Sequence, residues 1–503
     1  MRVGLLALAA LALAGCDSSP ISPDAGAATC EPACRDGFTC LRGECVSACN
    51  PPCGAGERCT GAGMCLPDDL DGGGAIDAGG EVTDGGAMDA SSPVADGGPS
   101  DGGASDAGAG AGACPGEQVR CGGACVAPTL PDVGVRLPTT GTYGTDWFDG
   151  GDIAVDPCTG TIGLAYAQQV DRSDNWEVYF AAVPPTLGAA LPAPIRITTA
   201  PGAADSVAIA WAGDRFLIFW ADPRHDPTPE ACSSRCLAEL YVAGFTATGA
   251  QVVPETRLTT FPSDHRVAST RAVYGPATGE VGVAWVDVYG TRQVYGAIVA
   301  PDGTMRAETE VSAAVSPQRG NSPRIVWNDD AWVLLYRHDD PDGARPDYLH
   351  TRKLGVSGLL SPDLDLRVPA EQIALTARGT LGYATVTTGG SPLQLRLWDL
   401  GWTATTTLAV STSTFDGSRG LAWDGDDLFV TNTGGTFDIV RFNGLGTETG
   451  RIPLTMDSGE RAASDVVMHR LGTRLILSWI YATRVAGSTI HHRVQVVDTS
   501  SAM

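Results

Sequence analysis

The stretch Trp211-Ala-Gly-Asp-Arg-Phe-Leu-Ile-Phe-Trp220 decides the fold of this 503-residue chain. Its Gly-Asp turn is flanked by apolar residues, as in a hairpin of two short strands. The unit returns at Trp327-Asn-Asp-Asp-Ala-Trp-Val-Leu-Leu-Tyr336 and at Trp423-Asp-Gly-Asp-Asp-Leu-Phe-Val-Thr-Asn432, with looser copies over 156–166, 274–285 and 469–479. A repeat of roughly 40–60 residues that contains only short strands predicts a ring of similar small sheets.

The repeats predict an all-β, seven-bladed β-propeller over residues 133–503. We expect the blades near 141–200, 203–262, 264–315, 317–369, 370–411, 413–456 and 458–503. The fifth segment lacks the tryptophan and the Gly-Asp turn, so six or eight blades stay open as alternatives. The last segment stops after a third strand, and residues 134–140 are similar to fourth strands such as Arg257-Leu-Thr-Thr260. Strand 134–140 is therefore expected to complete the last blade and remove its open edge.

Residues 1–15 have the pattern of a secretion signal. One arginine precedes an apolar run that is too short to span a bilayer. The run ends in Leu13-Ala-Gly-Cys16, which resembles the lipobox of bacterial lipoproteins. The resemblance implies cleavage before Cys16, lipid on its sulfur and firm anchoring in a membrane. An ordinary signal peptide with a coincidental cysteine is the alternative. We expect a location in the cell envelope, at the outer membrane or cell surface, with inner and outer membrane left unresolved.

Cysteine usage agrees with export into an oxidising compartment. Apart from Cys16, the chain has 14 of its 15 cysteines left, an even number suited to disulfides. After a short tether over 16–29, residues 30–66 contain two modules with one shared cysteine spacing, and 114–132 contain a further cysteine motif. Modules this small need cross-links to be stable. A zinc site is the alternative, but the usual Cys-x2-Cys pairs are absent.

The expected disulfide cysteines are Cys30, Cys34, Cys40, Cys45, Cys49, Cys53, Cys59, Cys65, Cys114, Cys121, Cys125, Cys158, Cys232 and Cys236. Cys158 is the expected fourth partner for the three cysteines of 114–132, and Cys232 is expected to pair with Cys236. Pairing within the two modules stays open, because four cysteines allow three connectivities. The modules and 114–132 resemble cysteine-rich stretches in surface lipoproteins of myxobacteria and related bacteria.

Between these motifs, residues 67–113 form a low-complexity linker of Asp, Gly, Ala and Ser. This segment holds nine aspartates, one glutamate and no basic residue. Its like charges and lack of large apolar residues predict an extended, disordered tether. The whole chain has a net charge of −25. Nucleic-acid binding is not expected, because it needs basic surface to neutralise phosphates.

Polar residues follow the second strand of several repeats or precede the first. In a propeller these two kinds of connection open onto the same face, beside a central channel. This face is therefore the expected ligand site, and its candidate residues are Asp222, Arg224, His225, His265, Arg266, Asp287, Arg337 and Asp339. Ordinary solvated loops are the alternative, since aspartate is common in turns.

The sequence lacks the signatures of several enzyme classes. It has no Gly-x-Ser-x-Gly elbow, no His-Glu-x-x-His motif and no phosphate-binding glycine loop. The Ser-x-Asp-x-Gly-x-x-Trp boxes of sialidases are also absent. Adjacent residues of a strand point to opposite faces, so His491 and His492 are not expected to share a metal. We predict no catalytic residue, no metal and no cofactor.

Two functions are consistent with these observations. The first is a non-catalytic lipoprotein, anchored in a membrane, whose propeller binds a protein or a glycan. The alternative is an extracellular polysaccharide hydrolase or lyase that uses carboxylates at the propeller mouth; such carboxylates are spaced in three dimensions and leave no sequence motif. A structural envelope component without a dedicated ligand is a third alternative. The oligomeric state is not predicted.

Overall fold

The structure, a computed structural model, describes short strand segments between residues 38 and 137 and most of residues 151–499. Within 151–499 the described residues exclude 171–174, 187–191, 230–236, 262–264, 289–291, 313–318, 340–346, 389–392, 411–419, 426, 433–436, 455, 457–459 and 484–489. The predicted signal peptide, Cys16, most of the linker, Cys232 and Cys236 lie outside the described residues. The chain divides into two compact units, Met1–Ala95 and Asp96–Met503.

The first unit contains two short hairpins. Strand β1 (Phe38–Leu41) pairs with β2 (Glu44–Ser47), and β3 (Glu57–Cys59) pairs with β4 (Cys65–Pro67). The registers set Cys40 opposite Cys45 and Cys59 opposite Cys65. The predicted disulfides of these modules lie outside what the structure describes.

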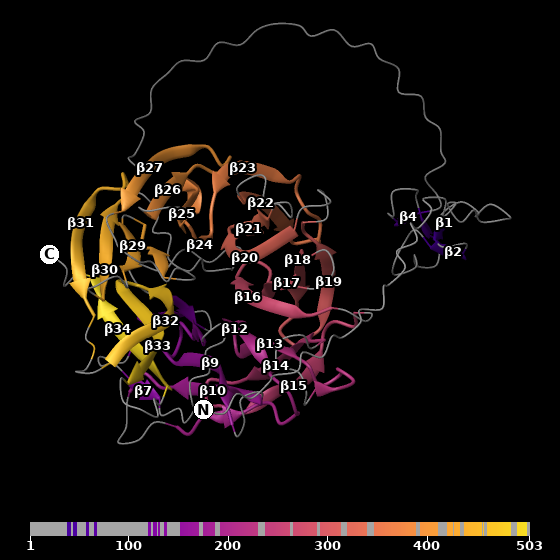
Figure 1. Ribbon diagram of the computed structural model, residues 1–503, viewed down its shortest axis with the longest axis horizontal. Helices are drawn as coiled ribbons and strands as arrows, with labels where there is room; N and C mark the ends of the chain where they lie inside the picture. Colours follow the sequence, from indigo (N-terminus) through magenta and orange to yellow (C-terminus); the bar gives the residue numbers. More distant parts are fainter. Residues whose placement is uncertain are drawn as a thin grey trace, which may run out of the picture. The chain divides into compact units, whose positions relative to one another are not determined.

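The second unit is a ring of seven four-stranded antiparallel sheets (Figure 1). The first three sheets are β8 (Asp152–Val155), β9 (Ile162–Gln169), β10 (Trp176–Val183) and β11 (Ile195–Arg196); β12 (Asp205–Trp211), β13 (Phe216–Asp222), β14 (Glu239–Phe245) and β15 (Gln251–Arg257); and β16 (Val267–Gly275), β17 (Glu280–Asp287), β18 (Gln293–Val299) and β19 (Met305–Glu310).

The remaining four sheets continue around the ring in sequence order. They are β20 (Arg319–Asn328), β21 (Ala331–Asp339), β22 (Tyr348–Gly355) and β23 (Leu364–Pro369); β24 (Gln372–Ala377), β25 (Tyr383–Thr388), β26 (Leu393–Trp398) and β27 (Ala404–Val410), with the 3-10 turn η3 (Gly379–Leu381); β28 (Leu421–Trp423), β29 (Asp427–Asn432), β30 (Asp438–Asn443) and β31 (Glu448–Pro453); and β32 (Glu460–Leu471), β33 (Arg474–Thr483), β34 (Ile490–Asp498) and β7 (Val135–Leu137).

The first strands of successive sheets contact one another all the way around, and β32 contacts β8. These strands therefore line the inside of a closed ring, which confirms the predicted all-β, seven-bladed propeller. The blade count excludes the alternatives of six and eight. The fifth segment forms a complete sheet although it lacks the repeat's tryptophan and Gly-Asp turn.

The seventh sheet takes strands from both ends of the unit. Strand β7 pairs antiparallel with β34, with Val135 opposite Val494 and Leu137 opposite His492. The ring thus closes through backbone hydrogen bonds between segments 355 to 359 residues apart in sequence. This pairing covers the outer edge that β34 would otherwise expose.

The core lies between the blades. Among the described residues, seven clusters of buried apolar side chains each join two neighbouring sheets. Two of these interfaces depend on a glycine that faces an aromatic ring of the next blade. A Cβ on Gly163 would lie 2.6 Å from the Phe216 ring, and one on Gly282 would lie 2.4 Å from the Trp332 ring. At these positions the sequence provides space for the ring, so the large residues of the repeat pack blade against blade.

One covalent link joins the cysteine motif to the first blade. Hairpin β5 (Val119–Cys121) and β6 (Ala124–Val126) precedes β7, and Cys121 forms a disulfide with Cys158 between β8 and β9. Their Cα atoms are 5.5 Å apart. Among the described residues no helix combines the length and apolar character needed to cross a bilayer.

Candidate functional site

We call one end of the ring the loop face. At this end each second strand leads to the third, and each blade connects to the first strand of the next. The predicted ligand residues lie there: Asp222, Asp287, Arg337 and Asp339 are at or near the ends of second strands, Arg224 and His225 follow β13, and His265 and Arg266 precede β16. The structure joins most of them in pairs, on blades two, three and four.

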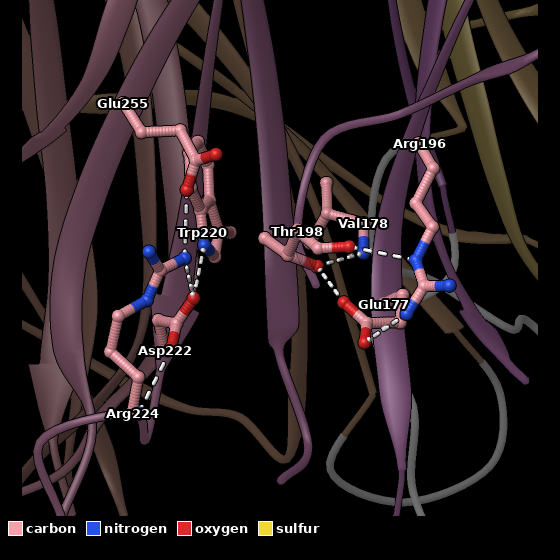
Figure 2. Close-up of polar contacts among 8 residues, drawn as sticks. All are labelled: Glu177, Val178, Arg196, Thr198, Trp220, Asp222, Arg224 and Glu255. Atoms are coloured by element: carbon pink, nitrogen blue, oxygen red, sulfur yellow. Dashed lines mark hydrogen bonds and ion pairs between the residues drawn. The ribbon is translucent and has the colours of Figure 1, made fainter. Parts of the chain in front are cut away.

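On blade two, Asp222 is the centre of a buried cluster (Figure 2). Its Oδ2 accepts hydrogen bonds from Trp220 Nε1 at 3.0 Å and from Arg224 Nη2 at 2.6 Å. Its Oδ1 accepts the backbone N–H of Arg224 at 2.9 Å. Arg224 also binds Glu255 at 2.8 Å and lies over the Tyr241 ring. Because its oxygens are engaged by the protein, Asp222 positions Arg224 instead of meeting solvent.

Arg224 supplies the positive charge of this cluster, and its side chain is partly exposed. Burial opposes that charge, but the two carboxylates beside it raise the pKa of Arg224 above its ordinary value. His225, the next residue, is exposed, and its ring stacks with the Tyr241 ring at a centroid distance of 6.1 Å. The accessible groups of this cluster therefore include the Arg224 guanidinium, the Glu255 carboxylate and the His225 imidazole.

On blade three, the two residues before β16 bind one aspartate. His265 Nδ1 lies 2.5 Å from Asp287 Oδ2, and the backbone N–H of Arg266 donates to Asp287 Oδ1 at 3.0 Å. The Arg266 side chain turns toward blade two and donates to Asp205 Oδ2 at 2.8 Å. His265 also stacks on Phe261, with centroids 4.8 Å apart. This group links the innermost strands of two blades.

On blade four, Arg337 and Asp339 form an ion pair at the end of β21. Arg337 Nε donates to Asp339 Oδ1 at 2.6 Å, and its Nη1 donates to the carbonyl oxygen of Glu371 at 2.7 Å. Asn321 Nδ2 donates to the second oxygen of Asp339 at 3.3 Å. The pair therefore ties blade four to the start of blade five.

A second polar arrangement recurs where the third and fourth strands meet (Figure 2). We call it the outer-strand cluster; in blade one it consists of Glu177, Thr198 and Arg196. Thr198 Oγ1 accepts the backbone N–H of Val178 at 2.9 Å and donates to Glu177. Arg196 Nη2 donates to the other oxygen of Glu177 at 2.5 Å. Burial raises the pKa of Glu177, while the hydrogen bonds from Thr198 and Arg196 oppose that rise.

The outer-strand cluster recurs in blades two and three, and a substitution in blade three shows what the glutamate position requires. Blade two has Glu239 with Thr259 and Arg257 in the same contacts. In blade three a glutamine takes the place of the glutamate: Ser312 Oγ accepts the Val294 N–H at 2.8 Å and donates to Gln293 at 2.5 Å. A neutral amide serves equally there, so the position requires a hydrogen-bond acceptor and not an ionisable acid. The Arg-x-Thr spacing of the fourth strands was the sequence signal for this cluster.

Three serines at the loop face have left-handed backbone conformations that the sequence did not predict. Ser206, Ser269 and Ser322 have φ values of 55°, 54° and 51°. Each lies where the first strand of its blade bulges against the second. The backbone N–H of Ser269 also donates to Ser206 Oγ at 3.2 Å. Left-handed backbone costs a non-glycine residue roughly 1–2 kcal/mol, and such strain gathers at functional sites.

A buried histidine pair on blade four was also missed. The ring centroids of His338 and His350 are 3.9 Å apart, and Asp363 Oδ2 lies 2.9 Å from His350 Nδ1. Tyr336 donates to Asp363 Oδ1 at 2.6 Å. Burial, with the neighbouring His350, lowers the pKa of His338 to about 4, so its ring is neutral at pH 7. The three groups come from β21, β22 and the segment before β23, and no sequence spacing connects them.

No protein-family model and no curated protein sequence matches the chain. Solved structures similar to it include the polysaccharide lyase Uly1, with 10% identity, a TM-score of 0.47 and coverage of 72% of this chain and 93% of that one. The α-L-arabinofuranosidase Arb93A of Fusarium graminearum has 11% identity, a TM-score of 0.42 and coverage of 75% and 99%. The β-propeller domain of the Trilobed protease from Pyrococcus furiosus has 9% identity, a TM-score of 0.39 and coverage of 69% and 95%.

Proposed function

We propose that this chain is a lipid-anchored protein of the bacterial cell envelope whose propeller binds a protein or glycan at the loop face without catalysing a reaction. The main support for a binding site at this face is that three adjacent innermost strands each have a strained serine: Ser206, Ser269 and Ser322. The Arg266–Asp205 ion pair joins two of these strands beside them. Strain repeated at one end of neighbouring blades supports a function for that end.

The side chains around these serines suit recognition. Arg224, His265 and Arg337 are partly exposed, and each is held by a carboxylate of its own blade. A ligand that binds these three side chains would not have to immobilise them, because their carboxylate partners already fix their conformations. Exposed imidazole and guanidinium groups offer hydrogen bonds to carboxylates or hydroxyls of a glycan or protein.

Two buried carboxylates at the loop face, Glu177 and Asp222, support binding over hydrolysis. Glu177 and Asp222 are both buried, and each of their oxygens accepts at least one hydrogen bond from its own blade. A general acid or base must reach a substrate proton, and these oxygens face the protein. The glutamine at the equivalent position of blade three further supports a structural role for Glu177.

Binding of the full-length protein to an array of glycans and envelope fractions tests the site. The double variant His225→Ala/His265→Ala removes two accessible imidazoles and leaves Asp222 in place. The matched control is Arg215→Ala, which removes an ion pair on the opposite end of blade two. We expect affinity to fall about 10-fold or more in the double variant, which is about 1.4 kcal/mol, and to stay unchanged in the control.

Two results would overturn this proposal. Release of product from any glycan would establish the hydrolase or lyase alternative. If the wild-type protein bound no glycan and no envelope fraction, a structural envelope role would be favoured.

The anchor is tested separately. The sequence Leu13-Ala-Gly-Cys16 supports lipid attachment at Cys16. We expect Cys16→Ser to move the protein from the membrane fraction to the soluble fraction, whereas Cys232→Ser stays membrane-bound. A Cys16→Ser protein that still sediments with membranes would contradict the lipid anchor.

A further inference from the structure

Two histidines of blade four lie on one face of the sheet. His338 is near the end of β21 and His350 is near the start of β22. The register sets His338 opposite Tyr348 and Tyr336 opposite His350, so the two imidazoles are diagonal neighbours. Asp363 approaches the same face from the segment before β23. Tyr336, which belongs to this group, packs in the core between blades three and four.

The hydrogen-bonding capacity of the His338 ring is not satisfied by the described residues. Its side chain is 3% exposed, and neither ring nitrogen has a hydrogen-bond partner among the described residues. A buried polar atom left without a partner costs about 1–3 kcal/mol. Its ring instead contacts the rings of Tyr336 and His350. The position therefore requires a partner that is not an amino-acid side chain of the described part of the chain.

We propose that His338, His350 and Asp363 bind a divalent transition-metal ion, with zinc as the preferred ion. One ligand atom from each residue, two nitrogens and one oxygen, lies within 4.8 Å of the others. Neutral imidazole and carboxylate are the ligands that zinc takes in proteins, at about 2.0–2.2 Å. Calcium and magnesium are disfavoured because they prefer all-oxygen sites.

The surrounding residues orient these ligands. Tyr336 donates to Asp363 Oδ1, so Oδ2 is the oxygen directed at His350. On the far side of the His350 ring, Asp365 Oδ1 lies 3.9 Å from Nε2, the place of the outer carboxylate that commonly supports a metal-bound histidine. Nδ1 of His350 is therefore the nitrogen assigned to the metal. The nearby cation Arg352 directs its donors to the carbonyl oxygens of Ser361 and Val311.

Metal binding requires the spacing of the ligand atoms to adjust. Asp363 Oδ2 and His350 Nδ1, which are 2.9 Å apart, would move slightly apart, and the His338 nitrogen, which lies within 4.8 Å, would move closer. Tetrahedral zinc holds its ligand atoms roughly 3.3–3.5 Å apart, given metal–ligand distances of about 2.0–2.2 Å. Rotation of the His338 ring about its side-chain bonds supplies the movement. The ion would link β21, β22 and the segment before β23. Because these segments belong to one blade, the site stabilises that blade whether or not the loop face binds a ligand.

Metal titration of the tag-free full-length protein tests this proposal. The protein is stripped with chelator under oxidising conditions and titrated with Zn²⁺ alone in a calorimeter, and then with Co²⁺, whose visible absorption reports nitrogen and oxygen ligands. We expect one equivalent bound, a melting temperature that rises with Zn²⁺ concentration, and loss of about 100-fold or more in affinity in His338→Phe. The control is His469→Ala, which removes an exposed histidine on β32 of blade seven and keeps wild-type affinity.

A second variant covers the case in which His338→Phe fails to fold. Asp363→Asn preserves size and the acceptor for Tyr336 but removes the carboxylate charge, so its Zn²⁺ affinity also falls. Absence of saturable Zn²⁺ binding in wild type would overturn the proposal. So would unchanged affinity in Asp363→Asn or His338→Phe, because the metal would then lie elsewhere in the chain. A melting temperature of His338→Phe that still responds to Zn²⁺ like wild type would have the same consequence.

Discussion

Thr198 and Glu177 join the fourth and third strands of blade one through a side-chain hydrogen bond, while the same threonine oxygen accepts the N–H of Val178. One hydroxyl thus serves as donor and acceptor in a position with no exposure to water. Strand β11 spans only Ile195 and Arg196, and after it the backbone N–H of Ile197 still donates to the carbonyl oxygen of Val178 at 2.8 Å. Side chains therefore extend the pairing of this short outer strand.

Removing that hydroxyl tests its contribution. Thr198→Val keeps the shape but leaves the Val178 N–H and one oxygen of Glu177 without it. We expect a loss of about 1–3 kcal/mol in the free energy of unfolding, measured by urea denaturation. Thr248→Val, at an exposed turn between the third and fourth strands of blade two, should change stability by less than about 0.5 kcal/mol. Equal effects in both variants would show that Thr198 has no special role.

The pH dependence of stability reports the carboxyl group of the same cluster. Because burial raises the pKa of Glu177, the folded state holds this proton more tightly than the unfolded state. The resulting stability is fully present below the ordinary value of 4.5 and is lost as the pH rises through the raised folded pKa. Glu177→Gln removes this dependence, so its stability relative to wild type should increase with pH across that window.

Urea denaturation of both proteins between pH 4 and pH 8 measures the difference. Exposed Glu371→Gln controls for the loss of one negative charge. A relative stability of Glu177→Gln that falls with rising pH would show that the carboxylate, and not the acid, is favoured in the fold.

The fold was predicted correctly from the sequence because its signals lie close together along the chain. Turn residues and alternating apolar residues recur in each blade, and they placed the seven sheets within the expected segments. The fifth blade shows that the signal is redundant. It forms without the tryptophan of the repeat position and without a Gly-Asp turn, because its neighbours supply packing surfaces and its own Trp398 and Trp402 are buried in the interface with blade four.

The site was harder to predict, because its partners come from different strands. The sequence indicated the face on which Asp222, Arg266 and Arg337 lie, but not that each is bound by a neighbour. The Arg266–Asp205 pair depends on how two blades are placed, and the left-handed serines depend on strand bulges. His338 and His350 meet only because the register of β21 and β22 sets them on one diagonal.

The glycine at the interface of blades three and four gives a third prediction. In Gly282→Ala the new Cβ would lie 2.4 Å from the fully buried Trp332 ring, whose Nε1 also donates to the carbonyl oxygen of Val273. The ring cannot move without breaking this bond, so we expect a loss of about 1–3 kcal/mol. In Gly296→Ala, on β18 of the same blade, the new Cβ meets a valine methyl at 3.2 Å and leucine methyls at 3.4 and 3.5 Å, so the variant should lose less than about 1 kcal/mol. Thermal unfolding of the two variants compares them directly, and similar losses would refute the packing argument.

The disulfide between Cys121 and Cys158 gives a fourth prediction. The double variant Cys121→Ser/Cys158→Ser avoids a free thiol and opens a loop with a sequence separation of 37. We expect a loss of about 2–4 kcal/mol in stability, measured by urea denaturation without reductant. The variant should be less sensitive to added reductant than wild type. If the double variant matched wild type in both respects, the link would not contribute to the stability of the ring.

That disulfide also decides how the ring would carry mechanical force. The segment between Cys121 and Cys158 contains β7, the strand whose pairing with β34 closes the propeller. A pull on the chain ahead of Cys121 passes through the sulfur bridge directly to the β8–β9 turn, and the segment with β7 stays slack. The closing strand is thereby taken out of the line of a force applied to the chain ahead of Cys121. Reduction of the bridge would pass such a force to the segment that contains β7, where the buried Leu130 side chain and then the three residue pairs of β7 would be loaded.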